Sequence, residues 1–474
     1  MFKNSIFYSF EKLSPKLISV LLLPILLRLI KPELWAEITL LLALQLLISY
    51  FLTQGDERSI LKFTSEEEVL YRSFTSLLRI SLLVLMIFEI VGYFFETLPF
   101  SLQYGLPFRF MYVSTVIISV NKLLLAKLRS LEKSTEIFKS SFFESLFINS
   151  IQLLFVAITV QLDGYDSRVI VTVYFLVQLF GNLFKFLYFA KSIEFKLTLV
   201  LKNLLAKKPK DFLKFSNISF LILISNYFVN WQDKFFVEII FGLKELGIYS
   251  VTTRISNLGL VFISSILIAA YSKYWPKTIE DKTDYQVKQI TGDIILISSY
   301  TMAALMLIVV SVGQYVFPTS YETSINMIDL ATVLIFLQTI VLIFSIDLGR
   351  ISNLKRIYFF NLAVIILQVS IYNLYSFENL EEIFILQIVT MLIFITAFFW
   401  KTVLLFKKEF TISLLLISAS VLIATFYQSS GSQILQLSSF LLSLFFASNV
   451  LQRWIKLDSN YKLLNYRCIL FFLF

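Results

Sequence analysis

The sequence contains no histidine, a single cysteine and only 12 glycines among its 474 residues. Without histidine, a His-based catalytic triad, a His metal site and a His proton relay are all excluded. One cysteine, Cys468, excludes intrachain disulfides and thiolate clusters. The nearest glycine pattern, Gly242 to Gly247, lacks the Gly-Lys-Ser/Thr of a phosphate-binding loop. We therefore expect no cofactor, no metal and no enzymatic activity.

Charged residues are also scarce, at 15% of the chain, whereas hydrophobic residues make up 58%. Ordinary soluble proteins are about 25% charged and about 45–50% apolar. A soluble fold of this length needs a polar shell, which this composition cannot easily supply. The composition therefore disfavours a soluble enzyme, a disordered protein and a secreted disulfide scaffold. It favours an all-α polytopic membrane protein.

Long apolar runs recur along the whole chain. A bilayer core of about 30 Å is crossed by a helix of about 20 apolar residues. Fourteen runs fit this length, at residues 13–30, 34–54, 74–96, 105–126, 141–162, 169–190, 212–231, 246–271, 289–317, 324–346, 357–375, 380–402, 410–427 and 433–452. The connections are mostly short, so we predict one compact body of about 14 transmembrane helices. No signal-peptide cleavage site is evident, and we expect the first span to stay in the mature protein.

The Lys and Arg residues are distributed unevenly between the two sides of these spans. If the N-terminus is placed in the cytoplasm, 30 of the 41 Lys and Arg fall in cytoplasmic segments and only Lys31, Arg168, Lys234 and Lys244 fall outside. Cytoplasmic loops of membrane proteins carry such an excess. We therefore predict cytoplasmic N- and C-termini. The net charge of +9 is a signal of topology, and we expect no nucleic acid as a partner.

Seven cations remain within the predicted spans or at their ends. On insertion scales, each charge near the bilayer centre costs roughly 2.5–3.5 kcal/mol. Four lie close to span ends, where a long side chain reaches the membrane surface: Arg79, Arg109, Lys122 and Lys401. The other three, Arg28, Lys185 and Arg254, are candidates for the lining of a cationic cavity. Guanidinium groups bind phosphate in a bidentate manner, so such a cavity would suit an anionic ligand.

Polar side chains share helical faces in several predicted spans. The faces comprise Gln178, Asn182 and Lys185 in one span, Asn226, Asn230 and Asp233 in another, and Asp329 in a third. Such faces should contact protein or water rather than lipid. Two interpretations stay open. Either these residues line a hydrophilic interior in which Asp233 and Asp329 serve coupling, or the amides hold helices together.

The chain also shows signs of two halves. The segment Pro32–Glu37 lies between spans one and two, and the loosely similar Lys244–Tyr249 lies between spans seven and eight. Internal repeats are common in transporters. We predict two six-helix lobes plus two C-terminal helices. The ranges are 1–190 for the N-terminal lobe, 191–211 for a basic cytoplasmic linker, 212–405 for the C-terminal lobe, 406–453 for the extra spans and 454–474 for a cytoplasmic tail.

Several stretches resemble a known family. In Pro24–Leu34 an apolar run with Arg28 ends span one before a short loop. The segment from Trp231 to Ile255 combines Asp233-Lys234, an apolar run, Gly242, Leu246-Gly247-Ile248-Tyr249 and Arg254. These patterns and the layout of the chain resemble the polysaccharide-biosynthesis flippases of the Wzx or O-antigen exporter type. They belong to the multidrug/oligosaccharidyl-lipid/polysaccharide (MOP) exporter superfamily.

The resemblance implies alternating access between two lobes that enclose a central cation-lined cavity. The implied cargo is an undecaprenyl-diphosphate-linked oligosaccharide, moved from the cytoplasmic to the outer leaflet of a bacterial inner membrane for surface polysaccharide assembly. Membrane lipid and a polysaccharide polymerase complex are the other implied partners. Arg28 and Arg254 are implied to meet the diphosphate by their motif positions, whereas Lys185 is a candidate only through its polar stripe.

Three other functions stay open on the sequence. A cation-coupled drug exporter of the same superfamily should have an acidic cavity, whereas the surplus charge within the spans is basic here. A membrane glycan polymerase or ligase would normally carry its chemistry on a sizeable outside loop, and every predicted outside loop is short. A scaffold or an inactive relative is the third alternative.

Overall fold

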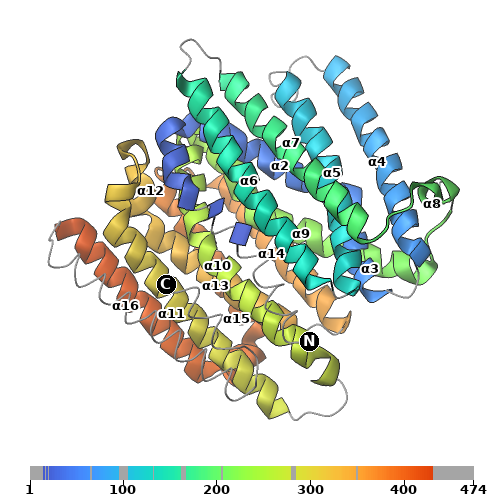
Figure 1. Ribbon diagram of the computed structural model, residues 1–474. Helices are drawn as coiled ribbons and strands as arrows, with labels where there is room; N and C mark the ends of the chain where they lie inside the picture. The colour runs from blue at the N-terminus through green and yellow to red at the C-terminus, as the bar shows by residue number, and fades with distance from the viewer. Residues whose placement is uncertain are drawn as a thin grey trace. The chain divides into compact units, whose positions relative to one another are not determined.

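The computed structural model describes residues 14, 15, 18, 19 and 21–430, apart from residues 64–66, 95–104, 132, 162–166, 204–205, 279–283 and 348–350. Within these ranges the regular structure is helical, with no strand. This confirms the predicted all-α class (Figure 1). The predicted span 433–452 and the tail 454–474 lie outside the described residues, as do parts of the span 13–30.

The described residues form two compact units, and each is treated by itself below. The N-terminal unit is Leu21–Gln232. The C-terminal unit is Asp233–Phe474 together with Met1–Val20, as far as these are described. The division falls between Gln232 and Asp233, inside a single long helix. The lobe ranges predicted from the sequence are defined by membrane spans, and they stay a prediction.

The N-terminal unit is built around one central helix. Residues 21–29 are helical. The helices that follow are α2 (Pro32–Thr53), α3 (Asp56–Lys62), α4 (Glu67–Phe94), α5 (Gly105–Ser130), α6 (Ser134–Gln161), α7 (Ser167–Ser192), α8 (Leu197–Lys202) and the first part of α9 (Lys210–Phe241). The central helix α5 packs against α2, α3, α4 and α7, and α6 packs against α7 (Figure 1).

The C-terminal unit contains the end of α9 and the helices after it. These are α10 (Leu243–Thr278), α11 (Asp284–Val316), the 3₁₀ turn η1 (Thr319–Tyr321), α12 (Glu322–Asn326), α13 (Ile328–Asp347), α14 (Ile351–Leu374), α15 (Leu380–Leu405) and α16 (Lys407–Ser430). In this unit α13 packs against α10, α11 and α15, while α16 lies along α11 (Figure 1).

Most of the described helices are suited to a membrane. Among the described residues, nine helices are long and apolar enough to cross a bilayer, or ten if one bent pair counts as a single span. Large apolar side chains stay exposed on α6 and α7, such as Phe143, Phe147 and Phe184. In a membrane such side chains face lipid rather than water. The chain is therefore a multi-pass membrane protein, whereas the number of 14 spans stays a prediction.

The predicted tenth span, 324–346, is broken in the structure. The segment Thr319–Asn326 and the helix Ile328–Phe344 are bent by 51° relative to each other. The break lies at Met327, whose backbone N–H bonds to the carbonyl oxygen of Thr323 as the short helix α12 ends. A run of apolar residues gives no sign of such a bend, because it records length and hydropathy only.

A close approach between α2 and α9 requires glycine. Gly55, between α2 and α3, has a φ of +76°, and a Cβ atom there would lie 2.6 Å from the carbonyl oxygen of Ser216 on α9. The backbone near Gly55 also accepts a hydrogen bond from Ser216, whose Oγ lies 2.6 Å from the carbonyl oxygen of Gln54. The sequence therefore permits this helix crossing only through the missing side chain.

The segment 191–211, predicted as a basic linker, packs against α3 and α4 within the N-terminal unit. Lys208 Nζ lies 2.5 Å from Asp56 Oδ2 in an ion pair that is almost fully buried. Ser216 Oγ also lies 2.7 Å from Asp56 Oδ1, so its one hydroxyl hydrogen is shared between Asp56 and the carbonyl oxygen of Gln54. Arg72 on α4 donates to the carbonyl oxygen of Lys207 at 3.1 Å. These contacts fix the segment to the N-terminal unit.

Candidate functional site

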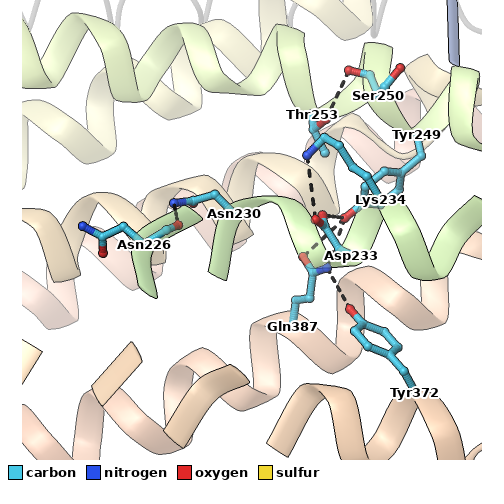
Figure 2. A network of polar contacts seen from close by, with 9 residues as sticks. All are labelled: Asn226, Asn230, Asp233, Lys234, Tyr249, Ser250, Thr253, Tyr372 and Gln387. Carbon is cyan, nitrogen blue, oxygen red and sulfur yellow. Dashed lines mark hydrogen bonds and ion pairs between the residues drawn. The ribbon is translucent and has the colours of Figure 1, made fainter. Parts of the chain in front are cut away.

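A buried polar cluster in the C-terminal unit surrounds Asp233, one of the residues singled out from the sequence. Asp233 lies on α9 with 5% of its surface exposed, and its carboxylate accepts a hydrogen bond from the hydroxyl of Tyr249 on α10 (Figure 2). Lys234 Nζ lies 3.8 Å from the other carboxylate oxygen, which accepts no hydrogen bond. A charged group inside a membrane protein needs such partners, because desolvation without them is costly.

Gln387 on α15 connects the cluster to α14. Its Nε2 donates hydrogen bonds to the hydroxyl of Tyr249 at 3.1 Å and to the hydroxyl of Tyr372 at 3.0 Å (Figure 2). The Tyr249 ring stacks on Phe384 at a centroid distance of 4.7 Å, and the Tyr372 ring stacks on Phe236 at 4.5 Å. Residues from α9, α10, α14 and α15 thus form one polar network that includes the Asp233 carboxylate. We call Asp233, Lys234, Tyr249, Tyr372 and Gln387 the Asp233 cluster.

The arrangement of the Asp233 cluster suits reversible binding of a proton or a small cation. One carboxylate oxygen is held by Tyr249, and the other has no hydrogen-bond donor. That second oxygen is the place where a proton or a cation can add. A neutral or cation-bound carboxylate would also weaken the attraction to Lys234. The hydrogen bond from Tyr249 on α10 to Asp233 on α9 would also change with occupancy of the site.

Arg254 lies in the same unit, on α10. Its Nη2 donates a hydrogen bond to Ser19 Oγ at 2.5 Å, and the side chain is half-buried. A contact between residues 235 positions apart ties α10 to the start of the chain. Arg254 is therefore placed next to a hydroxyl group, and its role in phosphate binding stays a prediction.

Arg28 lies in the N-terminal unit, on the helical segment 21–29. Its side chain is exposed, and four residues later Pro32 begins α2. Arg28 and Arg254 belong to different units. Arg79 and Arg109 are exposed, as expected for cations near span ends, while the side chain of Lys401 lies outside the described part.

Lys185 has an ion-pair partner that sequence reasoning did not identify. Its Nζ lies 2.5 Å from Glu144 Oε2 on α6 and 5.6 Å from the centre of the Phe189 ring. Both charged side chains retain little exposure, at 18% and 13%. The pair joins α6 to α7 and neutralises the lysine in this structure. Its position offers no net positive charge to an anion.

The predicted polar stripe of α7 faces protein, as expected. Asn182 Nδ2 donates to Ser114 Oγ on α5 at 3.2 Å, and its carbonyl oxygen accepts a hydrogen bond from Asn121 at 2.9 Å. Gln178 and Gln45 exchange hydrogen bonds between α7 and α2 at 3.1 and 3.3 Å. The amides of this stripe hold helices of the N-terminal unit together, which is the second interpretation left open by the sequence.

The other predicted residues lie in separate places. On α9, Asn230 is exposed, and its Nδ2 donates to the backbone carbonyl oxygen of Asn226 at 2.6 Å (Figure 2). Asp329 lies at the start of α13, where its Oδ1 accepts the backbone N–H of Leu330 at 2.7 Å. Asp329 is therefore a helix-terminal carboxylate in the first turn of its helix.

Sequence reasoning missed Gln387 and Tyr372. A signal for Gln387 was present, because it is a lone amide in the apolar run 380–402. Tyr372 gave no signal among 23 tyrosines. Within the described part of the chain, no group of three or more Cys, Asp or Glu side chains could hold a metal ion.

Solved structures share this fold. An outward-facing multidrug resistance transporter of the MATE family in the MOP superfamily aligns with a TM-score of 0.54 at 14% identity, over 88% of this chain and 96% of that chain. An inward-facing MATE transporter aligns with a TM-score of 0.52 at 13% identity, over 86% and 96%. A MOP superfamily transporter from Pyrococcus furiosus, described as having a binding pocket of reverse polarity, aligns at 0.54 and 14%, over 86% and 96%.

These likenesses show the fold of MOP superfamily transporters. None of the curated proteins matches the sequence. A family model described as polysaccharide biosynthesis protein matches residues 1–271, which is more than half of the chain. The chain therefore belongs to the polysaccharide biosynthesis protein family and has the fold of MOP superfamily transporters.

Proposed function

We propose that the protein is a flippase that moves a polyprenyl-diphosphate-linked oligosaccharide, of the undecaprenyl type, from the cytoplasmic to the outer leaflet of a bacterial inner membrane. Membership of the polysaccharide biosynthesis family, on a transporter fold, is the observation that carries the proposal. The cargo would feed surface polysaccharide assembly such as O-antigen or capsule. A polysaccharide polymerase complex is the proposed next recipient.

In this proposal Arg28 and Arg254 meet the diphosphate. Both are guanidinium groups, which stay charged at physiological pH and match the geometry of phosphate oxygens. Arg28 is exposed and Arg254 is half-buried beside a hydroxyl group. Lys185 is left out of the diphosphate site, because Glu144 already neutralises it.

The Asp233 cluster supplies the proposed coupling to an ion or proton gradient. The chain has no histidine, so a titratable carboxylate is the available group. Asp233 is buried and keeps one oxygen without a hydrogen-bond donor. Asp329 is the alternative carboxylate, and the two are distinguished by separate variants.

The experiment uses a bacterial strain whose surface polysaccharide depends on this gene. The double variant Arg28→Ala/Arg254→Ala should lose surface glycan while its amount in the membrane stays unchanged. Arg79→Ala is the matched control, because Arg79 is also an exposed arginine near a span end. Normal glycan export by the double variant would refute the assignment of these two residues to the diphosphate.

A cation-coupled drug exporter is the second candidate function. The solved relatives described as multidrug resistance transporters favour it, as does the buried carboxylate of Asp233. Under this alternative, expression should protect cells against cationic dyes such as ethidium. The flippase proposal expects no such protection.

A further inference from the structure

The ammonium group of Lys122 turns inward within the N-terminal unit, although its place near a span end suggested that it reaches the membrane surface. Its Nζ donates a hydrogen bond to Ser49 Oγ on α2 at 2.8 Å and lies 4.8 Å from the centre of the Tyr50 ring. Neither contact neutralises the charge. A charged side chain inside a membrane span costs free energy, so a lysine kept there is a candidate for a functional role.

The ammonium group of Lys122 keeps hydrogen-bond donors that no described residue accepts. A lysine ammonium has three N–H donors, and one of them goes to Ser49. Ser119 Oγ donates its one hydroxyl hydrogen to the carbonyl oxygen of Thr115 at 2.7 Å, so Ser49 donates the 3.0 Å hydrogen bond between the two hydroxyl groups. The described residues supply Lys122 with no other acceptor. Two N–H donors of the Lys122 ammonium group are therefore spare, and the oxygens of an anion such as phosphate could accept them.

Two oppositely charged residues of α3, Glu57 and Arg58, lie near this site. The carboxylate of Glu57 acts electrostatically on Lys122, and Arg58 is the next residue in the sequence. One oxygen of Glu57 is buried and accepts no hydrogen bond. Burial lowers the pKa of the Arg58 guanidinium and Glu57 opposes that shift, yet an arginine stays charged in proteins. Glu57 thus acts electrostatically on both Arg58 and Lys122.

The site lies at the opposite end of α2 from Arg28. The helix α2 begins at Pro32, four residues after Arg28, and Ser49 lies near its other end at Thr53. At 1.5 Å per residue, Pro32 and Ser49 are separated by roughly 25 Å along the helix. In the predicted topology α2 runs inward, so the Lys122 site lies toward the cytoplasm and Arg28 lies toward the outside.

A row of aromatic rings extends from the same site. The Tyr50 ring meets the Tyr227 ring edge-on at a centroid distance of 6.4 Å, and Tyr227 stacks on Trp231 at 6.3 Å. Tyr50 and Trp231 are half-buried, whereas Tyr227 is buried between them. Aromatic faces pack against the C–H faces of sugar rings. A cation at the end of an aromatic row is therefore suited to a sugar phosphate.

We propose that Lys122 binds a phosphate group of the lipid-linked sugar diphosphate at the cytoplasmic end of the N-terminal unit, with Tyr50 and Trp231 beside the first sugars. The site is an entry site, which the cargo occupies before it reaches Arg28. The inference rests on the proposed function, because that function supplies the cargo. It adds a binding residue and a direction of movement.

The test measures equilibrium binding to the full-length protein in phosphatidylcholine nanodiscs. The probe is farnesyl diphosphate, and farnesol serves as the control without phosphate. Loss of a charge-assisted contact in Lys122→Met should weaken binding about tenfold or more. Lys122→Arg should restore most of the affinity. Lys139→Met, which removes an exposed lysine of the same unit, should leave it unchanged.

Further probes separate the possible sources of the phosphate group. Inorganic phosphate should bind far more weakly than farnesyl diphosphate, and phosphatidylglycerol in the nanodisc should not compete. Strong competition by phosphatidylglycerol would instead assign the site to membrane phospholipid and would overturn the proposal. Equal affinity of the wild type for farnesol and farnesyl diphosphate would overturn it as well, as would undiminished binding by Lys122→Met.

Failure of the entry site and failure of the proposed function give different results. If Lys122→Met binds farnesyl diphosphate as well as the wild type does, the entry site fails even when lipid-linked oligosaccharide is still flipped. If Lys122 binds the probe but the wild type flips no lipid-linked oligosaccharide, the phosphate site stands and the flippase proposal fails. Melting temperatures of the variants show whether each protein is folded.

Discussion

The hydroxyl group of Tyr249 on α10 donates a hydrogen bond to the carboxylate of Asp233 on α9, and both side chains are buried. Gln387 on α15 donates to the same hydroxyl at 3.1 Å. This arrangement places one tyrosine between a charge and an amide that come from different helices. Tyr249 therefore determines how well the carboxylate is tolerated in the apolar interior of the C-terminal unit.

Replacement of Tyr249 by phenylalanine should destabilise the protein. The variant keeps the ring and its stacking on Phe384, but it leaves a buried carboxylate oxygen without its donor. An unsatisfied buried group costs about 1–3 kcal/mol, and more when it is charged. The melting temperature in detergent should fall. Tyr358→Phe is the control, because the Tyr358 hydroxyl makes no hydrogen bond to the described residues and its loss should have little effect.

Replacement of Asp233 by asparagine should uncouple transport. The amide keeps the size of the side chain and can still accept the Tyr249 hydrogen bond, so the fold should persist. It cannot bind a proton or a cation as a carboxylate does. Transport driven by a proton or sodium gradient across proteoliposomes should therefore drop by about tenfold or more, within the range that follows from loss of one charged interaction. Glu322→Gln, which changes an exposed carboxylate of the same unit, should transport normally. Full gradient dependence in Asp233→Asn would show that Asp233 is not the coupling group.

Three glycine variants separate steric clash from backbone strain. Gly55→Ala adds a Cβ atom 2.6 Å from the carbonyl oxygen of Ser216 and also forces alanine into a left-handed conformation. Gly242 has a φ of +89° and open space around it. Gly242→Ala therefore loses stability only because alanine disfavours this left-handed conformation, by roughly 1–2 kcal/mol. Gly105→Ala meets neither problem. We expect the melting temperature to fall most for Gly55→Ala, less for Gly242→Ala and least for Gly105→Ala. A Gly55→Ala protein as stable as Gly242→Ala would contradict the close approach of α2 and α9.

The buried ion pair between Asp56 and Lys208 can be measured by a double-mutant cycle. Removal of one partner from a buried pair costs about 3–5 kcal/mol, because the other charge stays buried. Lys208→Met should therefore destabilise strongly, and Asp56→Asn/Lys208→Met should destabilise less than the two single variants combined. The exposed pair of Arg72 and Glu68 is the control, since exposed pairs contribute roughly 0–1 kcal/mol. Chemical unfolding in mixed micelles gives the free energies. Additive effects would mean that segment 191–211 is not held by this pair.

A charge swap distinguishes a structural Lys185 from a ligand-binding one. Lys185→Gln should impair export because it leaves Glu144 without its partner inside a span. The swapped variant Glu144→Lys/Lys185→Glu re-forms the ion pair and should recover export. A swapped variant that folds but exports no glycan would instead indicate that the positive charge of Lys185 is needed where it stands.

Much of the architecture could be predicted from the sequence. Apolar runs of suitable length mark helices such as α2, α5 and α7 within a few residues, because burial in lipid requires a continuous helix. The pairing of charges could not be predicted. Lys208 and Asp56 are 152 residues apart in the sequence, and only the folded chain brings the segment before α9 next to the start of α3. For the same reason, the sequence did not identify Glu144 as the partner of Lys185.

The candidate site could be predicted in part, for a related reason. Asp233 and Arg254 stood out because a charge in an apolar run is unusual. Their neighbours did not, since tyrosine and serine are common in this chain. Lys122 was expected to reach the membrane surface because of its place near a span end. The structure instead turns it toward Ser49, which follows from the crossing of α2 and α5.

The central claim is that the protein moves a lipid-linked oligosaccharide across the membrane. It is tested most directly in liposomes that contain purified protein and a fluorescent polyprenyl-diphosphate-linked oligosaccharide, with dithionite added outside to quench the outer leaflet. We predict that wild-type protein makes nearly all of the fluorescence accessible, and that Arg28→Ala/Arg254→Ala leaves the inner leaflet protected, as in protein-free liposomes. Protection of the inner leaflet in the presence of wild-type protein, together with uptake of ethidium by the same liposomes, would contradict the account and identify a drug exporter.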